Sequence, residues 1–225
     1  ADNGRAALEV MSSKSISLII CDVMMPEMDG IEFSRQVKEN INYSHIPIIL
    51  LTAKTDIESQ ISGLKTGADD YITKPFNSRI LLEKIKNLIR LRERLWEKFN
   101  KQLVFNPGEL TSNSVDLKLL DRVKNVAETH LSNPDLDVSL FAREVGMSKS
   151  ILYEKLKSLT GKTINEFISS LRLKKAAELI LAGELNLSEI SLEVGYLDPN
   201  YFSKSFKKHF GVVPSKFSDK IKHLN

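Results

Sequence analysis

The chain has 225 residues, of which 42% are hydrophobic and 27% are charged, and its formal net charge is +3. This length allows one or two domains of an ordinary globular protein. A single Cys excludes an internal disulfide and is typical of a reducing compartment, so we expect a cytoplasmic protein. The sequence has no signal peptide and no run near the roughly 18 apolar residues of a membrane span, so we expect no membrane contact.

The positive charge lies in the second half of the chain. Residues 1–98 carry 14 basic and 14 acidic groups, whereas residues 99–225 carry 18 and 15. The last 25 residues hold six Lys and one acid. A basic end suggests a polyanionic partner, although surface Lys is more often only solvated.

Strands and helices alternate over the first part of the chain. After a short helix at about 5–12, the apolar run 16–21 predicts a strand buried on both faces, as in parallel sheets. We predict a turn at 24–30, a helix over 31–40, a strand at 46–51, a helix at about 56–66, a strand at 70–73 and a long helix from about Ser78. This alternation is typical of βαβ units with a parallel sheet.

The long helix changes character along its length. Leu82, Ile85 and Ile89 have helical spacing, and we expect the first half of the helix to pack on the sheet. The charged segment 90–98 predicts a helical connector or a short coiled-coil seam; a helix end that frays into a linker is the alternative. Turn residues at 106–108 and 111–114 predict a linker over 99–115, between domains at 1–98 and 116–225.

Three polar residues stand at the carboxyl ends of the three predicted strands: Asp22, Thr52 and Lys74. Right-handed crossovers bring these ends to one edge of the sheet. There a carboxylate can attack phosphorus, a hydroxyl can hydrogen-bond a phosphoryl oxygen, and an ammonium can neutralise its charge. Each residue alone is more often a helix cap or a solvated side chain, but together they predict a phosphate acceptor at Asp22.

The first part resembles the receiver domain of two-component response regulators over about residues 1–90. The resemblance rests on the strand into Asp22, Met-Pro-x-Met-Asp-Gly at 25–30, Leu-Thr-Ala at 51–53, Gly-Ala-Asp-Asp-Tyr at 67–71 and Lys-Pro-Phe at 74–76. It implies a flavodoxin-like sheet and phosphorylation of Asp22 by a histidine kinase. It also implies phosphoryl binding by Thr52 and Lys74, an aromatic switch at Tyr71 and a cis peptide bond before Pro75.

The resemblance further implies a Mg²⁺ site, and here the chain departs from the family. Receivers begin with a strand that ends in two acids, which hold the metal together with the acceptor and a backbone carbonyl, here that of Met24. No acid pair precedes Asp22, and Asp2 and Glu9 stand in the wrong context. We therefore expect a receiver that lacks its first strand, with Mg²⁺ needed by a complete receiver and not bound by this chain.

The second half contains a repeat. Glu-Val-Gly occurs at 144–146 and 193–195, and the two copies, about 139–161 and 188–211, each predict a short helix, a turn and a second helix. Ser148 and Asp198 are suited to cap the second helices, with Pro199 at the favoured first position. This is the helix-turn-helix plan, in which the second helix enters the major groove of DNA.

One long helix separates the two copies. Thr163-Ile-Asn-Glu166 is a capping box, and the helix that it opens runs to about Ala182. Such a helix spans about 28 Å, and successive major grooves on one face of DNA lie about 34 Å apart. It can therefore hold both second helices in adjacent grooves. A helix at about 116–131 would buttress the first copy.

This half resembles the DNA-binding domain of the AraC/XylS family of transcription regulators over about 116–218. The resemblance is strongest over 188–217, where Gly-Tyr-x-Asp-Pro-x-Tyr-Phe-Ser-Lys-x-Phe-Lys-Lys-x-Phe-Gly-x-x-Pro is close to the family signature. It implies an all-α domain of seven helices with two helix-turn-helix motifs.

Helical spacing separates core residues from DNA-facing residues on both second helices. The predicted buried stripes are Leu152, Leu156 and Leu159 on one helix, and Phe202, Phe206 and Phe210 on the other. The candidates for base contacts are Ser150, Tyr153, Glu154, Asn200, Tyr201, Ser203 and Lys204, and those for phosphate contacts are Lys149, Lys207 and Lys208. The alternatives are that both Tyr pack at helix ends and that several of these side chains are only solvated.

The sequence predicts no catalytic or zinc site. The four His share no metal spacing, no Ser/His/Asp or Cys/His set suggests hydrolysis, and Cys21 has the apolar surroundings of a core residue. An aspartyl-phosphate phosphatase would need a second acid two residues after the acceptor, where Met24 stands. We therefore expect a protein that is not an enzyme.

The leading hypothesis is a sequence-specific, DNA-binding transcription regulator that is controlled by phosphorylation of Asp22 in a two-component phosphorelay. Its partners would be double-stranded DNA and a histidine kinase, and a homodimer would be the active form. The order of domains also resembles the cytoplasmic end of hybrid two-component sensors that control polysaccharide use, which would place the kinase on the same polypeptide. The alternative is phosphorylation-independent DNA binding, with the receiver half as a dimerisation or docking module.

Overall fold

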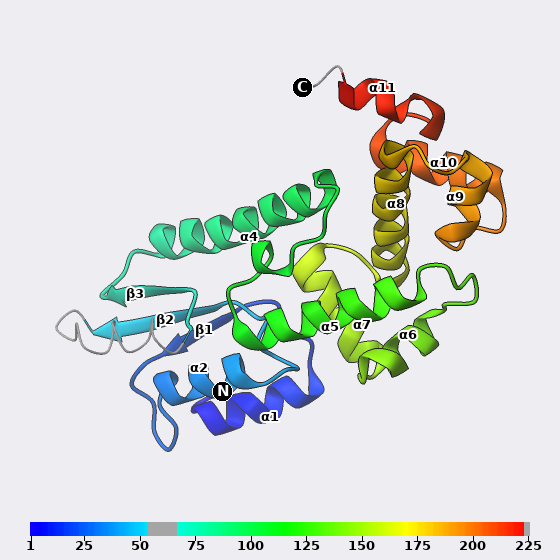
Figure 1. Ribbon diagram of the computed structural model, residues 1–225. Helices are drawn as coiled ribbons and strands as arrows, with labels where there is room; N and C mark the ends of the chain where they lie inside the picture. Colours follow the sequence, from blue (N-terminus) through cyan, green and yellow to red (C-terminus); the bar gives the residue numbers. More distant parts are fainter. Residues whose placement is uncertain (54–66, 223–225) are drawn as a thin grey trace. The chain divides into compact units, whose positions relative to one another are not determined.

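A computed structural model describes residues 1–53 and 67–222 (Figure 1), so the helix predicted at about 56–66 lies outside the described residues. The chain divides into two compact units. The first comprises Ala1–Leu95 and Thr111–Lys118, and the second comprises Trp96–Leu110 and Leu119–Asn225. None of the helices in the described ranges has both the length and the apolar character needed to cross a bilayer.

The first unit is an α/β arrangement around a small parallel sheet. It contains α1 (Gly4–Ser13), β1 (Ile19–Asp22), α2 (Gly30–Glu39), β2 (Ile48–Ala53), β3 (Asp70–Lys74) and most of α4 (Ser78–Lys101). All described strands are parallel, in the order β1-β2-β3. The predicted class, a parallel sheet without the first receiver strand, is confirmed.

The core of this unit lies between the sheet and the helices α1 and α2, which cover one of its faces (Figure 1). Phe33 and Val37 lie one helical turn apart on α2, and Ile48 and Leu50 point to the same face of β2, so each pair forms an apolar row toward this core. All four side chains are at most 2% exposed.

Two expectations for the first unit are wrong. Strand β1 begins at Ile19 and is not buried on both faces, because Ile20 is 43% exposed on a strand at the sheet edge. On α4, Leu82 and Ile89 are 55% and 52% exposed. The half-buried stripe runs instead through Leu81, Ile85, Leu88 and Arg92. Both stripes have helical spacing, and only packing against the sheet distinguishes them.

Helix α4 continues without a break to Lys101, which excludes the alternative of a frayed end. Its last turn and the residues after it contribute to the core of the second unit. Phe99 and Phe105 are 3% and 5% exposed, and both rings pack against Phe167 at centroid distances of 5.9 and 5.5 Å. The first part of the segment 99–115, predicted as a linker, is therefore packed rather than extended.

The second unit is all-α. It contains the end of α4, η1 (Pro107–Glu109), α5 (Ser114–His130) from Leu119 on, α6 (Val138–Val145), α7 (Lys149–Thr160), α8 (Ile164–Ala182), α9 (Leu187–Glu193), α10 (Pro199–Phe210), η2 (Pro214–Lys216) and α11 (Phe217–Lys222). The α-helices from α5 to α11 are the seven that the resemblance implies. The pairs α6–α7 and α9–α10 are the two helix-turn-helix motifs, which confirms the predicted fold.

The predicted helix caps are present. The backbone N–H of Ile151 donates to Ser148 Oγ at 3.3 Å, and that of Asn200 donates to Asp198 Oδ1 at 2.8 Å. Thr163 and Glu166 form the reciprocal capping box that opens α8. These bonds satisfy backbone donors that the first helical turn leaves without partners, so the sequence fixes where each helix begins.

Helix α8 contributes to the cores of both motifs (Figure 1). The apolar stripe of α7 is buried, with Leu152 and Leu156 both 0% exposed and Leu159 at 3%. Leu173, Ala176 and Ala177 of α8 join Phe202 and Phe206 in the core of the second motif. Phe210 is only partly buried, because it lies at the C-terminal end of α10.

Candidate functional site

Asp22, Thr52 and Lys74 lie together at the carboxyl edge of the sheet. Lys74 Nζ forms an ion pair with Asp22 Oδ2. The strand register aligns Asp22 with Leu51 of β2, and Ala53 with Lys74 of β3, so Thr52 lies on the central strand between the two charged residues. Thr52 is 2% exposed, whereas the side chains of Asp22 and Lys74 are 35% and 42% exposed. The Asp22 carboxylate is thus partly open to solvent beside the ammonium of Lys74.

The turn after β1 fixes the position of Asp22. The backbone N–H of Met24 donates to Asp22 Oδ1 at 3.2 Å, and that of Gly30 donates to the carbonyl of Val23 at 2.9 Å. A Cβ on Gly30 would lie 2.2 Å from the backbone oxygen of Asp22, so only glycine allows this approach. The Asp29 carboxylate caps α2 by accepting from the N–H of Glu32 at 2.7 Å.

Tyr71 lies on β3 and is half-buried against the core of the first unit. The ammonium of Lys84 lies 5.8 Å from the centroid of its ring, and Lys84 also pairs with Asp70 at 2.6 Å. The Lys74–Pro75 peptide bond is cis, as the resemblance implies. Tyr71 therefore lies on β3, which β2 separates from the strand that carries Asp22.

The residues near Asp22 do not make a complete Mg²⁺ site by themselves. Among the residues that the structure describes, no three His, Cys, Asp or Glu side chains are grouped to hold a metal. At the sheet edge the chain offers the Asp22 carboxylate, which is paired with Lys74, and the carbonyl of Met24. Mg²⁺ requires about six oxygen ligands in octahedral geometry, so these two groups supply only part of the set.

Cys21, which precedes Asp22, is a core residue. It is 6% exposed, and burial, followed by the charges of Asp22 and Asp29, raises its pKa to about 12. The side chain is therefore a thiol rather than a nucleophilic thiolate at neutral pH.

The predicted DNA-contact residues form two faces of the second unit. On α7 the residues Lys149, Ser150, Tyr153 and Glu154 are exposed, and on α10 the exposed residues are Asn200, Tyr201, Lys204, Lys207 and Lys208, with Ser203 half-buried. Tyr201 is 62% exposed, and its ring centroid lies 5.9 Å from that of Tyr196. The α7 face lines a hollow of about 600 Å³, which the N-terminal turn of α8 closes.

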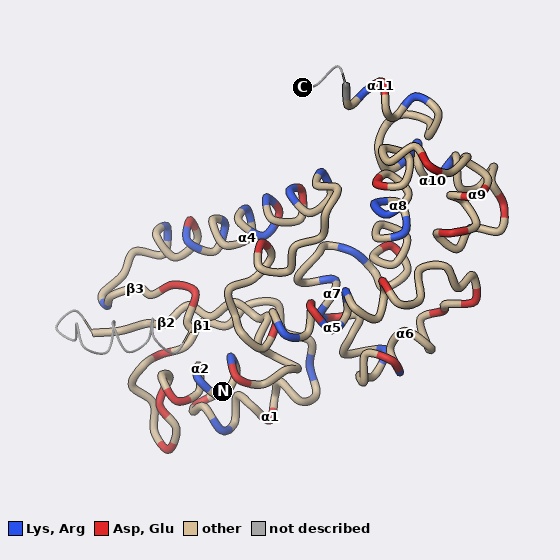
Figure 2. The backbone as a smooth tube through the Cα atoms, in the orientation of Figure 1, with Lys and Arg blue, Asp and Glu red and all other residues tan. Residues whose placement is uncertain are grey.

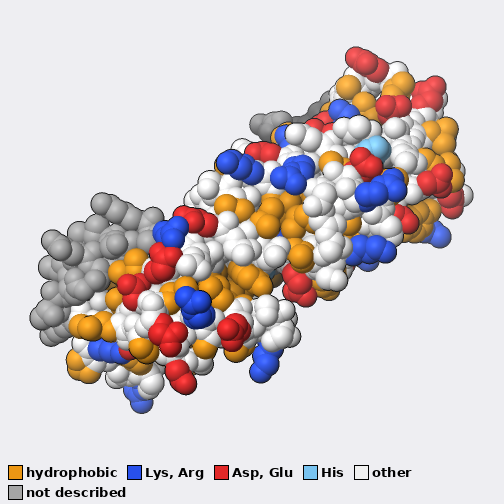
Figure 3. Space-filling model, turned by 90° about the horizontal axis from the view of Figure 1, so that it is seen from below, with side chains coloured by type: hydrophobic (Ala, Val, Ile, Leu, Met, Phe, Trp, Pro, Cys, Tyr) orange, Lys and Arg blue, Asp and Glu red, His pale blue; other side chains and the backbone are white. Residues whose placement is uncertain are grey.

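On the face of the molecule seen in Figure 3, basic, acidic and apolar side chains are interspersed. The helix N-termini, whose exposed residues include amide, hydroxyl and ammonium groups, are the features suited to read base edges.

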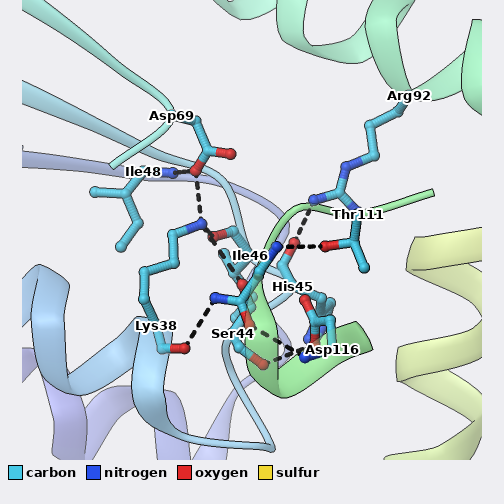
Figure 4. Close-up of polar contacts among 10 residues, drawn as sticks. Lys38, Ser44, His45, Ile46, Ile48, Asp69, Arg92, Thr111 and Asp116 are labelled. Atoms are coloured by element: carbon cyan, nitrogen blue, oxygen red, sulfur yellow. Dashed lines mark hydrogen bonds and ion pairs between the residues drawn. The ribbon is translucent and has the colours of Figure 1, made fainter. Parts of the chain in front are cut away.

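A buried polar network in the first unit was missed by sequence reasoning (Figure 4). Lys38 is 7% exposed, and its Nζ donates to Asp69 Oδ2 at 2.6 Å and to the carbonyl of Ile46 at 2.9 Å. Asp69 Oδ2 also accepts from the backbone N–H of Ile48 at 2.9 Å, which ties the start of β2 to the residue before β3.

The same network holds the start of α5. Ser44 Oγ donates to Asp116 Oδ1 at 2.7 Å, and Asn113 Nδ2 donates to the carbonyl of Lys38 at 3.0 Å. Arg92 donates to the carbonyl of His45. Burial lowers the pKa of Arg92, and the charges of Asp69 and Asp116 oppose this shift. The feature of the sequence that indicated this network is Arg92, the single Arg in the otherwise apolar stripe of α4.

Comparisons with known proteins agree with both halves of the chain. The family model described as "Response regulator receiver domain" matches residues 1–86, and that described as "Helix-turn-helix domain" matches residues 141–220. "Histidine kinase P4" of Formosa agariphila is 42% identical over 220 residues, which are 98% of this chain and 16% of that protein. The chain thus spans about a sixth of the length of this relative.

Shorter proteins are similar as well. The "Transcriptional regulatory protein SpaR" of Bacillus subtilis is 34% identical over an alignment of 169 residues that covers 70% of each chain. The solved C-terminal domain of AraT, a response regulator from Geobacillus stearothermophilus, is 31% identical, with a TM-score of 0.42, and the match covers 49% of this chain and 87% of that one. The chain belongs to the two-component response regulators, with a receiver domain followed by an AraC-type helix-turn-helix domain.

Proposed function

We propose that the chain is a sequence-specific transcription regulator whose DNA binding is controlled by phosphorylation of Asp22. The observation that carries this proposal is the Asp22–Lys74 ion pair beside the buried Thr52, in a unit matched by the receiver model. We assign DNA recognition to the N-terminal ends of α7 and α10, where the candidate side chains are exposed and the helices are capped.

The chemistry follows from the residues at the sheet edge. A carboxylate oxygen of Asp22 attacks the phosphorus of a phosphohistidine, the P–N bond breaks, and an acyl phosphate forms. Lys74, which neutralises the carboxylate before the transfer, would then pair with the phosphoryl oxygens, and Thr52 Oγ1 would donate a hydrogen bond to one of them. Tyr71, next to the core, would change rotamer in response to the movement of Thr52.

Helix α5 offers a route by which the state of the receiver reaches the DNA-binding unit. Its first residues, up to Lys118, belong to the first unit, and its remainder belongs to the second. Asn113 and Asp116 anchor that first turn in the buried network. Phosphorylation would shift an equilibrium between arrangements of the two units that already exist.

The Formosa relative supports a further part of the proposal. It is named a histidine kinase, and this chain matches 16% of its length. We place the kinase on the same polypeptide, as in hybrid sensors that regulate polysaccharide utilisation, with this chain at its cytoplasmic end. The active form would be a homodimer on double-stranded DNA.

The test is phosphoryl transfer to the native full-length protein. Acetyl phosphate should modify Asp22, as detected by mass spectrometry, and should change affinity for a duplex selected from a random pool. Asp22→Asn should abolish both effects. A modified Asp22 without any change in affinity or oligomeric state would contradict phosphorylation control.

Footprinting should show two protected major grooves about one turn apart per monomer. Protection of one groove would contradict DNA recognition by both motifs.

A second candidate function is favoured by exposed apolar residues on α4. Leu82 and Ile89 lie two turns apart on one face of α4 and are 55% and 52% exposed. Such an exposed apolar pair suits a receiver half that serves as a constitutive dimerisation or docking module. In that case Asp22→Asn would leave DNA affinity unchanged, whereas Leu82→Glu with Ile89→Glu would abolish dimers.

A further inference from the structure

A basic cleft separates the two DNA-facing surfaces of the second unit. It has a volume of about 720 Å³ and is lined by the end of α4, the end of α7, the start of α8 and one side of α10. Four ammonium groups line it, those of Lys157, Lys162, Lys204 and Lys208, and we call it the lysine cleft. The single carboxylate in its lining is that of Glu166, which accepts from both the N–H and the hydroxyl of Thr163 in the capping box of α8.

The positive charge of the lysine cleft has little compensation. Lys157 Nζ donates to the carbonyl of Gly161 at 3.1 Å, and within the described ranges Lys162, Lys204 and Lys208 form no ion pair. Burial lowers the pKa of Lys162; the nearby charge of Glu166 opposes this shift, and that of Lys157 adds to it. Burial, together with the charges of Lys162 and Lys174, lowers the pKa of His209 to about 4. An anion in this cleft would relieve the mutual repulsion of the ammonium groups.

The lysine cleft lies between the predicted DNA-contact residues of α7 (the α7 face) and those of α10 (the α10 face). Asn165 lines both this cleft and the hollow beside the α7 face. At the opposite side, Tyr201 and Lys204 belong both to the cleft and to the α10 face. The basic residues of α8 and α10 are visible as blue segments in Figure 2. A ligand that contacts both the α7 face and the α10 face along this side would therefore also lie against the lysine cleft.

Duplex DNA presents phosphates at this position. Two major grooves on one face lie about 34 Å apart, and the minor groove between them is bordered by the two phosphodiester backbones. Because the cleft lies between α7 and α10, we expect the backbone that runs between these two grooves to face it. Ammonium groups position a backbone by neutralising phosphates and carry no sequence information.

We infer that the lysine cleft binds the phosphodiester backbone that flanks the minor groove between the two recognition sites, with Lys157 and Lys162 as phosphate contacts. This inference rests on the proposed DNA binding and goes beyond it, because it assigns a binding role to the junction of the two motifs. The cleft would fix the spacing of the half-sites, since both motifs would then be held by one stretch of backbone.

The salt dependence of binding to a random duplex tests the inference without knowledge of the operator. Each neutralised phosphate contributes about 0.9 to the slope of log K against log salt concentration. Lys157→Gln with Lys162→Gln keeps most of both side chains and should lower the slope by about 1.8. The matched control is Lys101→Gln with Lys175→Gln, which removes two exposed lysines outside the cleft and should leave the slope unchanged.

The position of the contact is tested with a footprinted duplex. Uncharged methylphosphonate linkages between the two protected grooves should weaken binding of the wild type and have little effect on the Lys157→Gln, Lys162→Gln variant. Circular dichroism of each variant checks that the fold is intact. An unchanged salt slope, in a protein that binds DNA with two protected grooves, would overturn the role of the cleft alone. Failure of the wild type to bind any duplex would overturn the proposed function itself.

Discussion

The contact between Trp96 and Gly161 provides a sharp test of packing in the DNA-binding unit. Gly161 ends α7 in the left-handed region with φ 73°, and a Cβ there would lie 2.9 Å from Cδ2 of the Trp96 ring. Trp96 Nε1 also donates to the carbonyl of Ser158 at 3.0 Å, which holds the ring against the end of the recognition helix. Gly161→Ala should therefore both strain the backbone and displace the ring.

Gly183 is a matched control for this substitution. It ends α8 with the same φ of 73°, but no atom lies within 4 Å of a Cβ built on it. Alanine in the left-handed region costs roughly 1–2 kcal/mol, from which about 0.4–1 kcal/mol is recovered because the unfolded chain becomes stiffer. Gly183→Ala should thus lower the free energy of unfolding by about 1 kcal/mol. Gly161→Ala should cost about 1–3 kcal/mol more, as overpacking does.

The assay is urea unfolding followed by fluorescence, because Trp96 is the single tryptophan of the chain. Gly161→Ala should also shift the emission of the native state, which Gly183→Ala should not. A difference in free energy of unfolding below about 0.5 kcal/mol, the usual effect of a neutral surface substitution, would refute the reasoning. In the Trp96→Ala background, followed by circular dichroism, most of the extra cost of Gly161→Ala should disappear.

Three further predictions concern titration, reactivity and the buried network. The pKa of His209 in the folded state is about 4, below its ordinary value, so stability should fall on the order of 2–3 kcal/mol as pH decreases from 6.5 toward 4. The urea midpoint of His209→Gln should depend less on pH than that of the wild type. An unchanged pH dependence in this variant would show that another group causes it. Cys21, with a pKa of about 12, should resist iodoacetamide at pH 8 and react readily in urea; rapid labelling of the folded chain would contradict its burial. Lys38→Met should cost about 2–4 kcal/mol, somewhat less than a fully buried pair because Asp69 is 30% exposed. Hydrogen exchange of the backbone amides in β2 should be faster in Lys38→Met. Lys86→Met, which replaces an exposed lysine, is the control.

Sequence patterns determined the features that depend on local chemistry. The caps at Ser148, Asp198 and Thr163 and the ends of α8 follow from hydrogen bonds within one helical turn, so residues close in sequence suffice to specify them. The edge formed by Asp22, Thr52 and Lys74 was predictable because parallel strands joined by right-handed crossovers align their carboxyl ends.

Only the tertiary structure decided which of several permitted contacts form. The stripe through Leu82 and the stripe through Leu81 have the same helical spacing, and the sheet selects the second. The partners in the Lys38–Asp69 and Ser44–Asp116 pairs are 31 and 72 residues apart. Likewise, nothing in the sequence distinguishes Lys157 and Lys162 from solvated lysines. These two lysines line a basic cleft only because α7, α8 and α10 pack and bring like charges together. Electrostatic interactions depend on distance in space and not on separation along the chain.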